Sequence, residues 1–169
     1  EATLPLAQGE LKVFVKNMDS TTGAQYAQAV SSPQEADLAI VRLNTPWYPV
    51  DTKNFFAASF HHGDLDFKGE EKAEIMSLLA SVPTVVDIYL DRPAVIPDIT
   101  ASANALIANY GASDQSVCEV LFGNVSPKGK LPFELPSSME AVRNQKADLP
   151  YDSENPLFEF GFGLSYGEQ

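Results

Sequence analysis

Two short, almost uninterrupted apolar runs constrain the fold of this chain more than any other feature of the sequence. Residues 37–43 and 83–90 are rich in Val, Ile and Leu, and Asp87 is the one charged residue of the second run. Strands of this character are typical of parallel sheets, where helices bury both faces. Residues 11–15 and 105–109 are shorter β-rich segments and are predicted as two further strands.

Helical segments alternate with these strands. Helices are predicted over residues 21–30, 68–81, 98–103 and 113–122, with Asp19 or Ser20 capping the first and Gly123 closing the last. This alternation predicts an α/β fold, a mostly parallel sheet with helices on both faces in a flavodoxin-like three-layer sandwich. From residue 126 onward the chain is rich in Pro, Gly and aromatic residues, and we expect a tail that wraps over the sheet. Residues 1–169 are expected to form a single domain.

Charge and motif content exclude several classes of function. The formal net charge of −12 repels phosphate backbones and anionic lipids, so neither nucleic acid nor a membrane is an expected partner. No phosphate-binding loop is complete, because Leu131 follows Gly129-Lys130 where Ser or Thr is required, and no G-x-G-x-x-G follows the first strand. We therefore expect no cofactor. The single cysteine, Cys118, is predicted to be a buried, inert thiol.

Residues 44–66 form the most promising functional segment. This long aromatic stretch leaves the carboxyl end of a buried strand, where ligands gather in open parallel sheets. Trp47 and Tyr48 suit stacking on a sugar face, although packing is the alternative. Arg92 leaves the end of the next strand and is a second candidate for binding, with bracing of the sheet end as its alternative. His61 and His62 have no third residue spaced to complete a metal site, so no metal is expected.

Four ordered segments carry a family resemblance. They are Asp91-Arg92-Pro93-Ala94-Val95 after a buried strand, V-L-F-G at 120–123, S-P-K-G-K-L-P-F at 126–133 and P-L-F-E-F-G-F-G-L-S-Y at 156–166. Together they resemble the C-terminal α/β sandwich domain of family-three glycoside hydrolases of the β-glucosidase type. The last segment is the most specific of the four.

The resemblance implies a two-domain retaining enzyme that acts on β-glucosides or related oligosaccharides. In the family an N-terminal barrel supplies the aspartate nucleophile, and the α/β domain lends a loop with the general acid/base, commonly a glutamate. Retaining chemistry needs two carboxyl groups about 5 to 5.5 Å apart. The expected partners are therefore a carbohydrate and the N-terminal barrel of the same protein. A chain that starts Glu1-Ala2-Thr3 without Met is expected to lack that barrel and to be inactive alone. A secreted or periplasmic location is favoured over a cytoplasmic one.

The candidate loop departs from the family pattern in one respect. Gly63-Asp64-Leu65 matches the G-D-x-L stretch, but residues 57–62 contain no glutamate. Three hypotheses for the acid are open. In the first, Asp51 or Asp64 is the acid, with its pKa raised by burial against Trp47, Tyr48 and the barrel. In the second, His61 or His62 is the acid, because imidazole titrates near neutral pH. In the third, the acid lies elsewhere in the full protein, and this loop lines the pocket.

Each candidate also has a purely structural interpretation. Asp64 and Asp66 suit capping of the helix that starts near residue 68, a role favoured for Asp66. Either histidine suits simple loop hydrogen bonding. The candidates for catalysis are Asp64, His62 and Asp51. The candidates for substrate binding are Trp47, Tyr48, His61 and Arg92.

An exposed apolar patch is expected where the barrel would pack, formed by Trp47, Tyr48, Phe55, Phe56 and Phe60. The alternative function is a stand-alone flavodoxin-like binding or docking module without catalysis. A nucleotide-binding domain is disfavoured by the missing phosphate loop and the acidic charge.

Overall fold

The computed structural model describes residues 4–48 and 53–167, and within them the chain forms a five-stranded parallel sheet. The strand order is β2-β1-β3-β4-β5, and every neighbouring pair is parallel. This is the order of flavodoxin-like doubly wound folds. The strands are β1 (Lys12–Lys16), β2 (Gln28–Val30), β3 (Leu38–Asn44), β4 (Thr84–Tyr89) and β5 (Ala105–Asn109).

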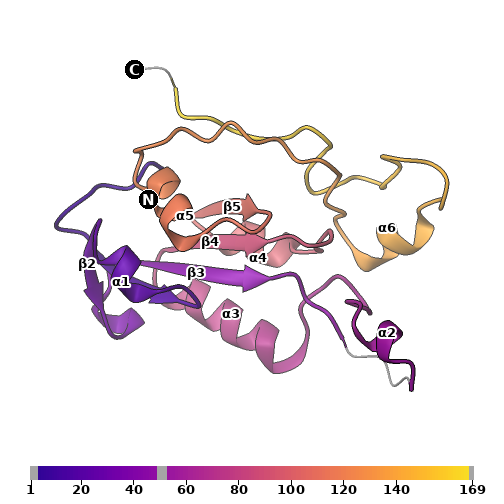
Figure 1. Cartoon of the computed structure of the whole chain (residues 1–169), viewed down its shortest axis with the longest axis horizontal. Helices are drawn as coiled ribbons and strands as arrows, with labels where there is room; N and C mark the ends of the chain where they lie inside the picture. The colour runs from indigo at the N-terminus through magenta and orange to yellow at the C-terminus, as the bar shows by residue number, and fades with distance from the viewer. Residues whose placement is uncertain (1–3, 49–52, 168–169) are drawn as a thin grey trace.

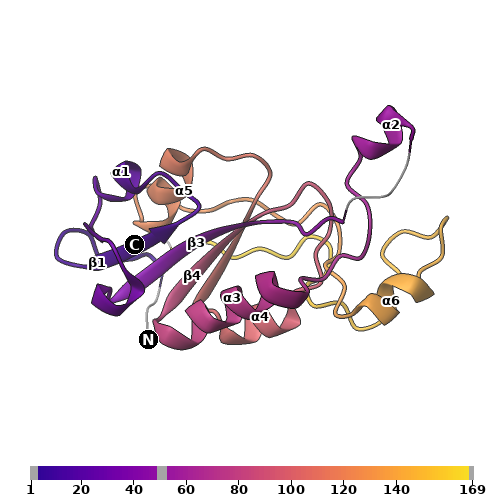
Figure 2. The same ribbon diagram turned by 90° about the horizontal axis from the view of Figure 1, so that it is seen from below.

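Helices cover both faces of the sheet (Figures 1 and 2). Figure 2 shows α1 (Ser20–Gly23) and α5 (Asp114–Leu121) above the sheet, with α3 (Gly69–Ser81) and α4 (Pro97–Ser102) below it. A short 3-10 turn, Pro33–Glu35, precedes β3. The three-layer α/β sandwich expected from the sequence is confirmed. None of the helices in the described part of the chain is both long and apolar enough to span a membrane.

Two apolar clusters fill the layers on either side of the sheet. Val86 and Ile88 face the α3 and α4 side, while Ile40 and Val85 face α5. Successive side chains of a strand point to opposite faces, so each buried strand contributes to both clusters. The tail contributes Leu131 and Leu135 to the α3 and α4 cluster, as its predicted course over the sheet requires. Cys118 is 1% exposed, so the predicted burial of its thiol is confirmed.

The predicted helix over residues 21–30 is wrong in its second half. Asp19 does cap α1 through a bond from the Thr21 backbone N–H, but the helix ends at Gly23. Residues 28–30 instead pair with residues 12–14 as the edge strand β2. Pairing with β1 overrides the helical preference of the Ala-rich sequence, because local propensity is weaker than a ladder of hydrogen bonds.

Two short helices at the carboxyl edge of the sheet were not predicted. They are α2 (Phe55–Ala58), inside the candidate loop, and α6 (Met139–Asn144), inside the tail. Figure 1 shows both beyond the arrowheads of the strands, on the side where ligands gather in this fold class.

A buried polar network ties together the strands near this edge. Arg42 donates from Nε to Asp87 Oδ2 at 2.6 Å and from Nη1 to Asp114 Oδ1 at 2.5 Å. Asn109 Nδ2 donates to Asp87 Oδ1 at 2.7 Å. Burial raises the pKa of Asp87, whereas the bonds from Arg42 and Asn109 act in the opposite direction. The network links β3, β4, β5 and the start of α5.

Candidate functional site

The loop after β3 returns to the carboxyl edge of the sheet and pairs with itself there. The Tyr48 backbone N–H donates to the carbonyl of His62 at 2.8 Å. The outgoing segment with Trp47 therefore runs beside the returning segment with His61 and Asp64. Asp51, a predicted acid, lies outside the described residues.

Arg92 connects the two segments of this loop. Its Nη2 donates to the carbonyls of Pro46, His62 and Asp64 at 2.5, 3.1 and 3.0 Å, and its Nη1 donates to Gly63 O at 3.1 Å. A planar guanidinium with several donors suits such a task. These contacts agree with the interpretation that Arg92 braces the end of the sheet. A role of Arg92 in substrate binding stays a prediction.

His61 is held from two sides. Its Nδ1 contacts Asp91 Oδ2, and its ring stacks on Trp47 with 5.0 Å between the ring centroids and an angle of 5° between the planes. The His61 side chain is still 42% exposed. Asp91 is absent from the sequence-based candidates, although its place directly after β4 and beside Arg92 was a usable signal.

His62 takes a different environment from its neighbour. Its ring meets Phe60 edge to face, with 6.5 Å between the centroids and an interplanar angle of 83°. Its carbonyl bonds to Arg92 and Tyr48, so its backbone is part of the loop framework. The structure therefore does not bring the two predicted histidines to a common point.

Asp64 lies in an ion-pair cluster rather than in an apolar pocket. Its carboxylate bonds to Lys68 and lies 3.4 Å from Arg143 Nη2. The hydrogen bond from Lys68 lowers the pKa of Asp64, with Arg143 acting in the same direction and burial opposing them. In this domain without the barrel the pKa of Asp64 is therefore lowered, and its role as the acid in the full-length protein stays a prediction.

Asp66 does not cap the following helix. The N-cap residue of α3 is Lys68, and no side chain makes a capping bond there. Asp66 instead accepts at its carbonyl from Tyr48 Oη at 2.8 Å, and its Oδ1 lies 3.5 Å from Lys68 Nζ. The capping role predicted for Asp64 and Asp66 is wrong, because the helix starts at Gly69 with its Lys68 cap in extended conformation.

Tyr48 belongs to the framework of the loop and not to its exposed surface. The side chain is half-buried, and a Cβ added at Gly63 would lie 2.7 Å from Tyr48 Cδ2. Gly63 also has φ +85°, so glycine is required there for two reasons. The other members of the predicted patch are exposed: Trp47 by 46%, Phe55 by 79%, Phe56 by 77% and Phe60 by 65%.

The Lys68 contact gives a pH prediction for Asp64. A carboxylate whose pKa is lowered by folding stabilises the fold above the ordinary carboxyl value of about 4, and this contribution is lost as the pH falls through the lower folded value. Lys68→Met should move the pKa of Asp64 back toward its ordinary value, measured by NMR titration of the carboxyl carbon. Arg143→Met, at a 62% exposed side chain, should move it less. A titration midpoint above the ordinary value in the unaltered chain would contradict the ion-pair assignment.

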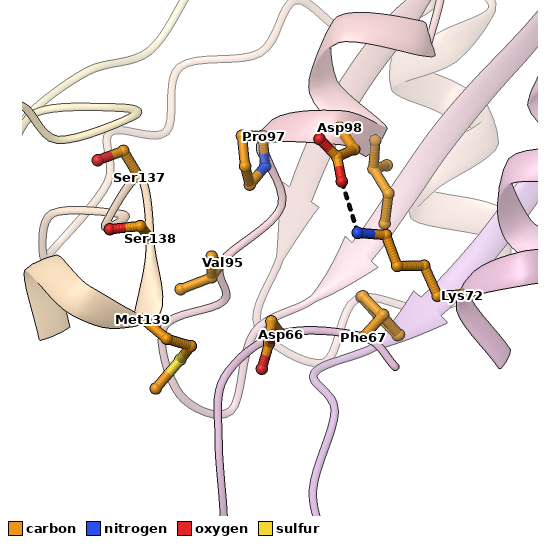
Figure 3. Close-up of a pocket in the computed structure, with 10 residues that line it drawn as sticks. Asp66, Phe67, Lys72, Val95, Pro97, Asp98, Ser137, Ser138 and Met139 are labelled. Atoms are coloured by element: carbon orange, nitrogen blue, oxygen red, sulfur yellow. Dashed lines mark hydrogen bonds and ion pairs between the residues drawn. The ribbon is translucent and has the colours of Figure 1, made fainter. Parts of the chain in front are cut away.

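A separate hollow of about 220 Å³ lies between α4 and the start of α6 (Figure 3). Lys72 and Asp98 form an ion pair on one side of it, and Ser137, Ser138 and Met139 lie on the other. None of the predicted site residues lines this hollow. Among the described residues, no group of three His, Cys, Asp or Glu side chains is placed to hold a metal ion.

Comparison with known protein families decides the class of this domain. The family model described as "Glycosyl hydrolase family 3 C-terminal domain" matches residues 2–166. The chain belongs to this family. The match covers the sheet, the candidate loop and the Pro-, Gly- and aromatic-rich tail, in agreement with the resemblance carried by the four sequence segments.

Relatives and solved structures agree with the family assignment. The chain is 44% identical to β-glucosidase C of Emericella nidulans over 98% of its length and 27% of the relative's. It is 41% identical to the periplasmic β-glucosidase/β-xylosidase of Dickeya chrysanthemi over 96% of its length and 25% of the relative's. The fold is similar to that of β-D-glucoside glucohydrolase from Trichoderma reesei, with a TM-score of 0.71 and 16% identity over 98% of this chain and 34% of that one. The chain thus spans about a quarter of the length of these curated relatives.

Proposed function

We propose that this family-three domain works as the C-terminal part of a retaining β-glycosidase that hydrolyses β-glucosides or related oligosaccharides. The observation that carries the proposal is the loop at the carboxyl edge of the sheet. Arg92 joins the two described segments of this loop through bonds to their carbonyls, and His61 and Trp47 are stacked on each other and partly exposed. Relatives named β-glucosidase over nearly the whole chain support the substrate class.

The partner of this surface is the N-terminal barrel of the same protein. Phe55, Phe56 and Phe60 belong to the loop and are each more than 60% exposed, and exposed apolar clusters of this kind mark contact surfaces. The length of the relatives beyond the matched region leaves room for such a barrel. Docking of the barrel over these rings would enclose the loop and a bound sugar between the two domains.

The retaining mechanism determines what each of the two domains contributes. The barrel supplies the carboxylate that attacks the anomeric carbon, and the loop supplies proton transfer and an aromatic face for the sugar. The domain alone therefore lacks the nucleophile and is inactive. A secreted or periplasmic location is proposed, supported by the periplasmic relative from Dickeya chrysanthemi.

The proposal predicts that activity requires both domains. The full-length protein should hydrolyse an aryl β-glucoside, and proton NMR of the first product should show the β anomer, as retention demands. The domain with the present sequence and the barrel alone should each show no turnover above the buffer blank.

Two results would contradict this proposal. Turnover by the isolated domain would place the nucleophile on this chain. A full-length protein that binds but does not cleave β-glucosides would favour the non-catalytic docking module instead.

A further inference from the structure

His61 and Asp91 form a side-chain pair that joins two different connections at the carboxyl edge of the sheet. His61 comes from the loop after β3, and Asp91 follows β4. The His61 Nδ1 contacts Asp91 Oδ2, and the two side chains are 42% and 24% exposed. The pair is therefore partly shielded but open on one side.

The contacts define the orientation of the imidazole ring. Asp91 engages Nδ1, so Nε2 is the nitrogen that remains for another molecule. The Trp47 indole, parallel to the imidazole within 5° at a centroid distance of 5.0 Å, covers one face of the ring. A carboxylate that accepts from Nδ1 selects the tautomer and orientation of a histidine, and it stabilises the imidazolium form.

We propose that His61 is the proton donor and acceptor of the glycosidase reaction and that Asp91 is its positioning residue. This assignment rests on the proposed function. In the first step His61 Nε2 gives its proton to the glycosidic oxygen as the C1–O bond breaks and the barrel carboxylate bonds to C1. In the second step neutral Nε2 takes a proton from water while the water oxygen bonds to C1 and the carboxylate leaves. The histidine and the nucleophile are both restored at the end of the cycle.

The other described candidates are less suited to this role. Asp64 is bound by Lys68, which lowers its pKa and keeps it ionised, whereas a proton donor must start protonated. The His62 ring packs edge to face against Phe60, and its backbone carbonyl accepts bonds from Arg92 and from the Tyr48 amide.

The test uses the full-length protein with alanine and glutamine at position 61. His61→Ala and His61→Gln should lower kcat/KM about 10²- to 10⁴-fold on glucosides with poor leaving groups. The loss should be much smaller on a dinitrophenyl glucoside, whose leaving group needs no proton. Added azide should raise turnover of this activated substrate and yield the β-glucosyl azide, because an anionic nucleophile needs no general base. A residue with only a packing role would not produce this azide product.

A second variant tests the pairing with Asp91. Asp91→Asn keeps the shape of the side chain but removes the carboxylate that orients the imidazole, so kcat/KM on glucosides with poor leaving groups should fall while kcat/KM on the dinitrophenyl glucoside changes much less. The matched control is Asp98→Asn, which removes a carboxylate paired with Lys72 on the surface and should leave kcat/KM on both substrates unchanged. Unchanged kcat/KM on poor leaving groups in Asp91→Asn would overturn the positioning role.

The outcomes separate this inference from the function it rests on. An active full-length protein in which His61→Ala keeps normal turnover on poor leaving groups would overturn the inference alone. The same holds if His62→Ala, and not His61→Ala, shows azide rescue. A full-length protein with no glycosidase activity would overturn the proposed function, and the inference would fail with it.

Discussion

Replacing Asp87 by alanine should lower the free energy of unfolding by about 3 to 5 kcal/mol. Asp87 is 0% exposed and accepts bonds from Arg42 at 2.6 Å and from Asn109 at 2.7 Å. Its removal leaves the Arg42 guanidinium, itself only 16% exposed, without its buried partner on β4. Urea unfolding followed by far-UV circular dichroism measures the change.

A double variant distinguishes the effect of the ion pair from the effect of side-chain volume. Arg42→Met with Asp87→Leu removes both charges and replaces them with apolar side chains. The free energy of unfolding should fall by clearly less in this double variant than the sum of the decreases in the two single variants. Asp98→Ala is the matched control, because its ion pair with Lys72 is exposed and should contribute no more than about 1 kcal/mol. If Asp87→Ala lowers the free energy of unfolding as little as Asp98→Ala does, the network does not stabilise the sheet.

The second large effect is expected at Arg92. Arg92→Ala removes the donors to the carbonyls of Pro46, His62, Gly63 and Asp64, so the two segments of the loop should separate. Hydrogen exchange at the Tyr48 amide, which donates to His62 O, should become faster while the amides of β3 and β4 keep their protection. In the full-length protein kcat/KM should fall about 10²-fold, because small displacements of catalytic groups have effects of this size.

Two further variants distinguish bracing from substrate binding. Arg92→Lys keeps the charge but not the planar donor set, so it should restore only part of the protection and activity. Arg143→Ala, at an exposed arginine near Asp64, should leave Tyr48 exchange unchanged. If Arg92→Ala raises KM without any change in exchange, Arg92 contacts the substrate and does not shape the loop.

The strands that the sequence predicted well are those whose own composition demands burial. The runs that became β3 and β4 are apolar on both faces, and no other placement removes both faces from water. The composition of the edge strand β2 does not require burial, since two of its three residues are exposed. It is extended because it pairs with β1. An edge strand that forms through pairing with a neighbouring strand shows no strand pattern in its own sequence. The helix predicted over this segment was wrong for this reason.

The candidate loop was found as a region, but not as a set of contacts. Its length, aromatic content and position after a buried strand were visible in the sequence. The partners of its side chains were not. The sequence did not show that Asp64 pairs with Lys68, four residues later, and Tyr48 was expected on the surface but bonds to the Asp66 carbonyl. Asp91, 30 positions from His61, was named only as part of the segment after the third strand and not as a partner of His61.

The sequence alone determined the layered parallel sheet, the family and the segment that reaches the carboxyl edge. Each of these depends on patterns within short stretches, namely apolar runs, turn residues and family motifs, which act locally along the chain. The tertiary structure alone decided which side chains meet at that edge. Arg92 reaches four carbonyls of one loop and Asp91 reaches His61 only after β3 and β4 pair in register, because parallel pairing brings together connections that are far apart in sequence.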